Sequence, residues 1–151
     1  MPQMSTDSRA TPIGTVSVTE QGGSIISLRI GGSEKGSGSD VTDEAFTQLF
    51  EYLEGGRKEF NLELGPNGTP FQKDVWNALM KIPYGKTVSY SEIAKASGHP
   101  KALRAVGTAI GKNPIPVIIP CHRVIRSDGS IGGYALGIDL KIRLLRLEDT
   151  L

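Results

Sequence analysis

Residues 89–111 read SYSEIAKASGHPKALRAVGTAIG and contain two helix starts separated by a turn. Ser89, followed three residues later by Glu92, forms a capping box that opens a short helix closing near Gly98. Pro100 then opens a second helix that runs to about Gly111. Two short helices joined by a glycine-containing turn are typical of a helix-turn-helix, although the spacing by itself favours an ordinary helical hairpin.

The distribution of charge favours DNA binding by these helices. The chain has 151 residues and a net charge of +1, but residues 1–69 carry a net charge of −5 and residues 70–151 a net charge of +6. Only the second part is therefore expected to bind a polyanion. Arg104 lies on a polar stripe of the second helix, and the small residues around it allow close approach to a sugar-phosphate backbone.

Turn-forming residues 65–68, at the change of charge, predict a boundary between a domain of residues 1–68 and a domain of residues 69–151. The first domain is predicted to hold a hairpin of residues 16–18 and 26–30 around Gly22-Gly23, a mobile loop at 31–39, a helix from about Thr42 and a strand at 60–64. The first domain contains no catalytic cluster, so we expect it to support the second domain structurally. The second domain is predicted to begin with a helix capped by Thr69 and Gln72, before the helix-turn-helix. The last helix of this domain is predicted over about Asp139 to Glu148.

The single cysteine, Cys121, limits the possible chemistry. One thiol makes no internal disulfide, and with only two histidines a four-ligand zinc site is hard to build, so we expect no metal. A single cysteine is typical of a protein in a reducing, intracellular compartment. The longest apolar stretch, Ile115 to Ile119, is too short for a membrane span, and we expect a soluble protein without a targeting segment.

A lone cysteine is more often a small buried hydrophobe than a nucleophile. Here Pro120 fixes the backbone before the thiol, His122 is a base or a thiolate partner, and Arg123 adds positive potential. Glu148 is a candidate to orient His122 if the last helix folds back on the cysteine loop. The residues alone leave both interpretations of Cys121 open.

The sequence Pro120-Cys121-His122-Arg123-Val124, preceded by Asn113 to Ile119, resembles the active-site signature of the O6-alkylguanine-DNA alkyltransferases. The resemblance extends over about Thr69 to Glu148, through the segments 71–76, 82–86, 88–90, 104–107 and 132–134. It implies a mixed α/β fold, with a small first domain that is ribonuclease H-like in the family and a winged helix-turn-helix second domain. It also implies a DNA repair methyltransferase that moves an alkyl group from O6 of guanine, and less well O4 of thymine, to Cys121.

The resemblance assigns roles to individual residues. Cys121 would accept the alkyl group irreversibly, in a single turnover and without a cofactor; His122 would take the thiol proton through a water, and Glu148 would hold the imidazole. Tyr90 would donate toward the departing base, and Asn113 would order the turn before the cysteine. The pocket for the base would be lined by Tyr134, Ile131, Ile110, Val124 and Ala135.

The partner implied is double-stranded DNA that carries O6-alkylguanine, bound through its minor groove with the damaged base flipped out. Arg104 would fill the space that the base leaves. The other DNA contacts expected are Lys101, Ala105, Thr108 and Arg126. A monomer in the cytoplasm is expected, associated with the nucleoid, or in the nucleus of a eukaryotic host.

Two alternatives from other classes remain at this point. One is a DNA-binding regulator or lesion-recognition protein that uses the same helices and carries an incidental buried thiol. The other is a cysteine hydrolase built on Cys121, His122 and Glu148. Replacement of Cys121 would leave the first function intact and abolish the second, and repeated turnover would distinguish a hydrolase from an alkyltransferase.

Overall fold

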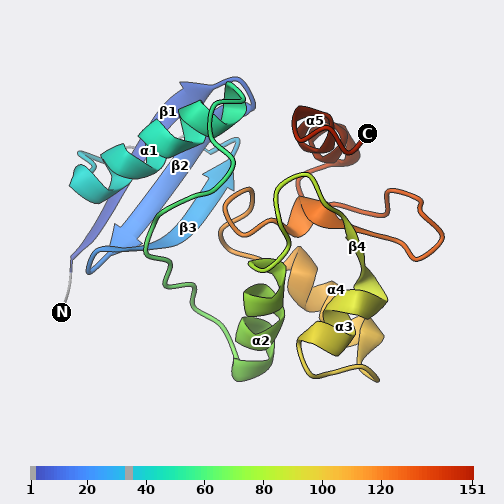
Figure 1. The fold of residues 1–151 in the computed structure, drawn as a ribbon. Coiled ribbons are helices and arrows are strands. Elements are labelled where there is room, and N and C mark those ends of the chain that lie inside the picture. Colours follow the sequence, from blue (N-terminus) through green and yellow to red (C-terminus); the bar gives the residue numbers. More distant parts are fainter. Residues whose placement is uncertain (1–2, 33–35) are drawn as a thin grey trace. The chain divides into compact units, whose positions relative to one another are not determined.

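A computed structural model describes residues 3–32 and 36–151, and the chain divides into two compact units, Met1–Asn67 and Gly68–Leu151 (Figure 1). Each unit buries its own set of apolar side chains. The mixed α/β fold predicted from the sequence is confirmed, since the first unit combines a sheet with a helix and the second is mainly helical. Within the described ranges, no helix has the length and apolar character needed to cross a bilayer.

The first unit is an antiparallel sheet of β1 (Met4–Thr11), β2 (Gly14–Gln21) and β3 (Ser24–Ile30), in that order, with α1 (Asp40–Leu53) across one face (Figure 1). The predicted hairpin is β2 and β3, in which Val18 pairs with Leu28. Both side chains are buried, and residues directly opposite each other in an antiparallel pair lie on the same face of the sheet. The predicted helix is α1, which starts at Asp40 because Ser39 caps it through the backbone N–H of Thr42.

Two features of the first unit differ from the prediction. β1 was not predicted, because its sequence MSTDSRAT lacks the alternation of apolar residues, and its cross-strand contacts include hydroxyl pairs such as Thr6 with Thr19. The strand predicted at 60–64 is wrong: in that segment Leu64 forms a single bridge with Ile25. Of the loop predicted at 31–39, residues 33–35 lie outside the described residues.

Three packed helices open the second unit: α2 (Pro70–Leu79), α3 (Tyr90–Ala96) and α4 (Leu103–Gly111). The indole N–H of Trp76 in α2 donates to the carbonyl of Ala109 in α4 at 2.9 Å, which ties two helices through a buried hydrogen bond. α3 and α4 form the predicted helix-turn-helix. α4 starts later than Pro100, because residues 99–102 first form a turn closed by the Ala102 N–H and the His99 carbonyl.

The remaining elements bring the cysteine segment into the core of the second unit. A 3₁₀ turn, η1 (Cys121–Arg123), leads into β5 (Val124–Ile125), which pairs in parallel with β4 (Val88–Ser89) just before α3. The last helix, α5 (Ile138–Leu147), contacts η1, and Glu148 directly follows it as its C-cap. The pairing of β4 and β5 places the start of α3 beside the chain that leaves Cys121.

Candidate active site

The cysteine loop is closed by a side chain that bonds to both of its ends. The amide of Asn113 donates to the Ile119 carbonyl at 2.8 Å and accepts from the Ile115 N–H at 2.9 Å. Between them, buried Val117 has a φ of 74°, in the left-handed region that β-branched residues seldom adopt. Asn113 therefore stabilises a tight turn directly before Cys121, the place that the resemblance to the family gave it.

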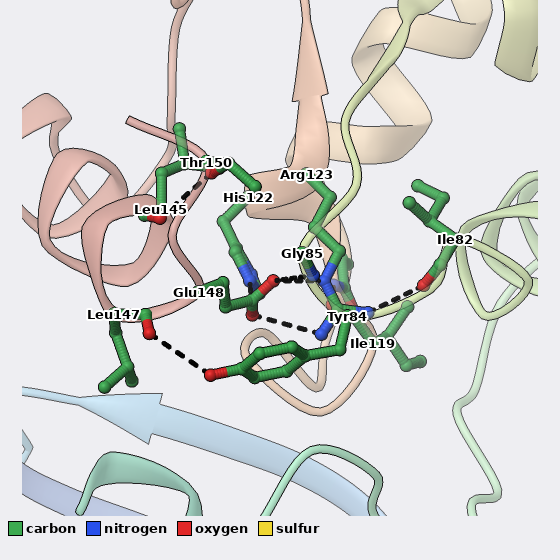
Figure 2. Close-up of polar contacts among 11 residues, drawn as sticks. Ile82, Tyr84, Gly85, Ile119, His122, Arg123, Leu145, Leu147, Glu148 and Thr150 are labelled. Carbon is green, nitrogen blue, oxygen red and sulfur yellow. Dashed lines mark hydrogen bonds and ion pairs between the residues drawn. The ribbon is translucent and has the colours of Figure 1, made fainter. Parts of the chain in front are cut away.

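His122 and Arg123, from η1, both point to the carboxylate of Glu148 at the end of α5 (Figure 2). The His122 Nε2 lies 2.7 Å from Glu148 Oε2, and Arg123 donates to both oxygens at 2.8 and 3.0 Å. The Gly85 N–H reaches Glu148 Oε1 at 3.3 Å. The pairing of His122 with Glu148 was expected, whereas the sequence did not indicate that Arg123 would bind the same carboxylate.

This arrangement fixes which imidazole nitrogen carries the proton. Because the Glu148 carboxylate accepts from Arg123, it acts as an acceptor toward His122 as well, and the proton lies on Nε2. The lone pair of the neutral ring then lies on Nδ1. Burial lowers the pKa of His122, against an opposing effect of Glu148, so that the ring is neutral at pH 7 and able to act as a base.

The thiol of Cys121 is also neutral at rest. Burial raises the pKa of this thiol above its ordinary value, while hydrogen bonds from the Asn113 and Tyr134 side chains and the charge of Lys141 lower it. A neutral thiol would have to lose its proton before its sulfur could act as a nucleophile.

A cavity of about 290 Å³ opens beside Cys121, at the lower end of the range for small-ligand sites. Its lining includes the predicted residues Tyr90, Tyr134, Ile110 and Ala135, together with Gly107, Gly111, Asn113, Pro116, Gly133 and Leu136. Val124 and Ile131, also predicted for the pocket, are outside the lining. Burial raises the pKa of the Tyr90 phenol, so it is protonated and able to donate.

The residues predicted to contact DNA are all exposed. Arg104, Ala105 and Thr108 lie on α4, Lys101 lies in the turn before it, and Arg126 follows β5. The Ser91 and Ser127 hydroxyls, 3.2 Å apart, join the first turn of α3 to the segment of Arg126. Ile110, on the same helix as Arg104, is buried. α4 therefore has one face in the core, at the cavity, and another available to a ligand.

One buried residue at the site, Lys141, was missed by sequence reasoning. Its side chain is fully buried, and its ammonium donates to backbone carbonyls around the cysteine. The signal is present in the sequence, because Lys141, Leu144, Leu145 and Glu148 are spaced i, i+3, i+4 and i+7 on α5. All four are buried, so two charged residues share the apolar stripe of this helix.

The second unit thus combines a helix-turn-helix, as found in DNA-binding proteins, with a buried cysteine that borders a cavity and is followed by a histidine paired with a glutamate. The sequence model described as "6-O-methylguanine DNA methyltransferase, DNA binding domain" matches residues 70–150. The chain belongs to this family, which confirms the resemblance found in the sequence.

One relative and two crystal structures illustrate how far the similarity extends. A methylated-DNA–protein-cysteine methyltransferase of Methanosarcina acetivorans is 57% identical over 107 residues, which cover 71% of this chain and 69% of the relative. A crystal structure of O6-methylguanine methyltransferase from Mycobacterium tuberculosis has a TM-score of 0.87 at 41% identity, covering 98% of this chain and 94% of that one. A crystal structure of Mycobacterium tuberculosis OGT in complex with DNA has the same TM-score at 42% identity, covering 95% and 91%.

Proposed function

We propose that this chain repairs DNA directly, by moving the alkyl group from O6 of guanine in duplex DNA to the Sγ of its own Cys121. The observation that carries this function is that the buried Cys121 lines a cavity of the size of a base. The next residue, His122, is held by Glu148. The relatives named as methylated-DNA–protein-cysteine methyltransferases support it. Thymine alkylated at O4 is a poorer substrate of the same site.

The reaction is a displacement at the alkyl carbon. The Cys121 thiol gives its proton to Nδ1 of His122 through a water, and the sulfur forms a bond to the methyl carbon as the bond from that carbon to O6 breaks. The electron pair of the broken bond stays on guanine, which takes up one proton, so the net change is exchange of a thiol hydrogen for the methyl group. The resulting thioether has no leaving group for water, and each molecule reacts once. No cofactor enters this balance.

The remaining site residues assist this displacement. Glu148 holds the imidazole with its lone pair on Nδ1, and Asn113 holds the turn that presents the thiol. The Tyr90 hydroxyl, in the cavity wall, donates toward the guanine ring as negative charge develops there. Tyr134, Ile110 and Ala135 form the walls that contact the flat base. Val124 and Ile131 do not line the cavity and would support its walls from the outside.

DNA binds through the exposed face of α4 in the minor groove, and the damaged guanine rotates out of the stack to reach the cavity. Arg104 enters the space that the base vacates. Lys101, Ala105, Thr108 and Arg126 contact the backbone, which gives binding that depends little on sequence, as a protein that scans for damage requires. A monomer suffices, because one chain supplies every group that the step uses.

The two parts of the chain divide these tasks. Residues 69–151, with a wing after the helix-turn-helix, supply the DNA-binding surface and the reactive site, and residues 1–68 support them. We place the protein with the DNA it repairs, in the cytoplasm at the nucleoid, or in the nucleus of a eukaryotic host.

Intact-mass measurement tests the proposal directly. The protein is mixed with excess duplex DNA that carries one O6-methylguanine, with the Cys121→Ser variant in parallel. We expect a gain of one methyl group, located on Cys121, that is absent from the variant and does not increase with time. An unchanged mass despite tight DNA binding would instead support the lesion-recognition function, and release of products over many turnovers would support a hydrolase.

A further inference from the structure

Leu103, at the start of α4, is an apolar side chain that the core does not cover. The sequence pattern puts Leu103, Val106 and Ile110 at i, i+3 and i+7, on one apolar stripe of the helix. Val106 and Ile110 are buried, whereas Leu103 is 48% exposed. The stripe therefore continues past the core at the first turn of α4, where it leaves an apolar side chain in contact with water.

A single exposed leucine is common in proteins, so its place decides whether it has a function. Among the residues that the structure describes, the exposed large apolar side chains are Met4, Met80, Leu103, Ile138 and Leu151. Of these, only Leu103 lies on the helix proposed to enter the minor groove, directly before Arg104. Ala102 and Ala105 flank this pair in the sequence, so no long side chain stands beside it along the chain.

Leu103 also lies beside the entrance to the site. An open hollow of about 360 Å³ is lined by six residues: Tyr90, Ser91, Leu103, Arg126, Ser127 and Gly133. Tyr90 and Gly133 line the cavity beside Cys121 as well, so the hollow and the cavity are neighbours. A base that rotates from the exposed face of α4 into the cavity therefore passes the part of the helix that carries Leu103.

The chemistry of this side chain suits the inside of a base stack. Proteins that bind the minor groove often insert an apolar side chain between two base pairs, which unstacks them and bends the duplex. A leucine makes this contact without losing hydrogen bonds to water, while a guanidinium has five N–H donors that need partners. Arg104 is thus suited to the polar space that the base vacates, and Leu103 to the apolar faces of the neighbouring base and sugar.

We propose that Leu103 is a positioning residue, a wedge that separates the damaged guanine from the base stacked beside it while Arg104 fills the vacated space. This proposal rests on the proposed function. Leu103 touches no reacting atom, so it acts through the conformation of the DNA. Its loss should slow methyl transfer from duplex DNA, where stacking and pairing oppose extrusion of the base, far more than transfer from a single strand.

The test compares Leu103→Ala with Met80→Ala, which truncates a side chain of similar exposure, 44%, that lines neither the hollow nor the cavity. The methyl-transfer rate constant is measured in single turnovers at saturating protein, on a duplex with one O6-methylguanine and on the same strand without its complement. For Leu103→Ala we expect the rate constant to fall by about tenfold on the duplex and to stay within about twofold on the single strand. Met80→Ala should match the wild type on both. Leu103→Met, which restores an apolar side chain of similar length, should recover most of the rate on the duplex.

A fluorescent base measures the separation directly. 2-Aminopurine, which brightens when it is unstacked, is placed beside O6-methylguanine in the duplex, and Cys121→Ser prevents the reaction while the complex is observed. We expect Cys121→Ser to raise the fluorescence on binding, and the double variant with Leu103→Ala to raise it by about half as much or less. The dissociation constant of undamaged duplex DNA should stay within about twofold, because the wedge acts only where a base is extruded.

An equal loss of rate on the duplex and on the single strand would overturn the proposal, because it would place the effect of Leu103 in the site or in the fold. An equal rise in fluorescence with and without Leu103 would overturn it too, as would a Leu103→Met variant as slow as Leu103→Ala. If the wild type gains no methyl group from either DNA, the proposed function fails, and the fluorescence of the Cys121→Ser complexes still tests whether Leu103 unstacks the neighbour of the lesion.

Discussion

At the residue scale, the carboxylate of Glu148 is the centre of the site. It is 2% exposed and accepts hydrogen bonds from His122, Arg123 and the Gly85 N–H. Arg123 also donates to the Ile82 carbonyl at 2.7 Å, so its guanidinium joins the end of α5 to the segment after α2 (Figure 2). The carboxylate that contacts His122 is thus fixed by a buried ion pair with Arg123, and the proposed role of Glu148 in the reaction and the stability of the fold would depend on the same contacts.

Replacement of Glu148 by Gln should therefore lower both stability and reactivity. The amide keeps the shape but leaves the buried charge of Arg123 without its counter-ion, at a cost of about 3 kcal/mol in the free energy of unfolding. It also no longer selects the tautomer of His122, and we expect methyl transfer to slow by about 100-fold. Urea unfolding and single-turnover mass measurements check both values. The exposed Glu92→Gln is the matched control, and an equal loss in that variant would refute the role of Glu148.

The pKa of His122 makes a second prediction, on the dependence of stability on pH. Because burial lowers this pKa below 6.5, the unfolded chain binds a proton near pH 6 that the folded chain does not. The stabilising contribution of neutral His122 to the free energy of unfolding is therefore fully present above pH 6.5. It is lost as the pH falls toward the pKa of His122 in the folded protein, by up to about 1.4 kcal/mol per pH unit.

Urea unfolding at pH 7.0, 6.0 and 5.5 measures this dependence in the wild type, in His99→Gln and in His122→Gln. His99 is only partly buried and lies outside the contacts of His122 with Glu148, so its replacement is the matched control and should preserve the loss of stability with acid. His122→Gln should remove it. A wild-type stability that stays constant from pH 7.0 to 5.5 would show that His122 titrates alike in both states.

Sequence reasoning predicted part of the site at this scale. Cys121 and His122 are adjacent in the chain, Glu148 was a candidate if the last helix folded back on the cysteine loop, and the role of Asn113 came from the resemblance to the family. The contacts of Lys141 with three carbonyls, and the left-handed backbone of Val117, depend on how distant segments meet. No local pattern carries that information, although a lysine on an apolar stripe is a signal that was available.

At the element scale, the helices were predicted better than the strands, because their ends carry side-chain signals. The capping box of Thr69 and Gln72 is present at the start of α2, and the Ser89 hydroxyl accepts from the Glu92 N–H at the start of α3. β1 was missed because polar strands have no such signal, and residues 60–64 alternate without having a partner strand along their length. α4 also lacks a side-chain cap, since its N-cap is Ala102, and its start was predicted too early.

The cap of α2 gives a prediction that separates stability from chemistry. Thr69→Ala removes the hydroxyl that accepts from the Gln72 N–H at 3.1 Å and should lower the free energy of unfolding by about 1 kcal/mol. Because neither residue lines the cavity, the methyl-transfer rate constant should stay within about twofold of the wild type. Thr69→Ser, which keeps the hydroxyl, is the control. A slower transfer in Thr69→Ala, with Thr69→Ser normal, would link the start of α2 to the reaction.

At the scale of the whole molecule, charge and chemistry lie in the same part of the chain. Residues 68 and 69 are uncharged, so the units Met1–Asn67 and Gly68–Leu151 carry the net charges of −5 and +6 found by dividing the sequence. All proposed catalytic, cavity and DNA-contact residues belong to the second unit. An acidic first unit is repelled by phosphates, and the attraction of the protein to DNA must therefore come from the basic unit.

This division predicts how salt affects DNA binding. Backbone contacts from the charged residues Lys101 and Arg126 would displace about two counterions, and the logarithm of the association constant should fall with the logarithm of salt concentration with a slope of about −2. Arg126→Gln should reduce the slope by about one, since it removes one phosphate contact. Lys58→Gln, at an exposed position of the first unit, should leave it unchanged. Fluorescence anisotropy with undamaged duplex DNA between 50 and 300 mM salt measures the slopes, and an equal change in both variants would mean that the first unit also contacts the phosphates.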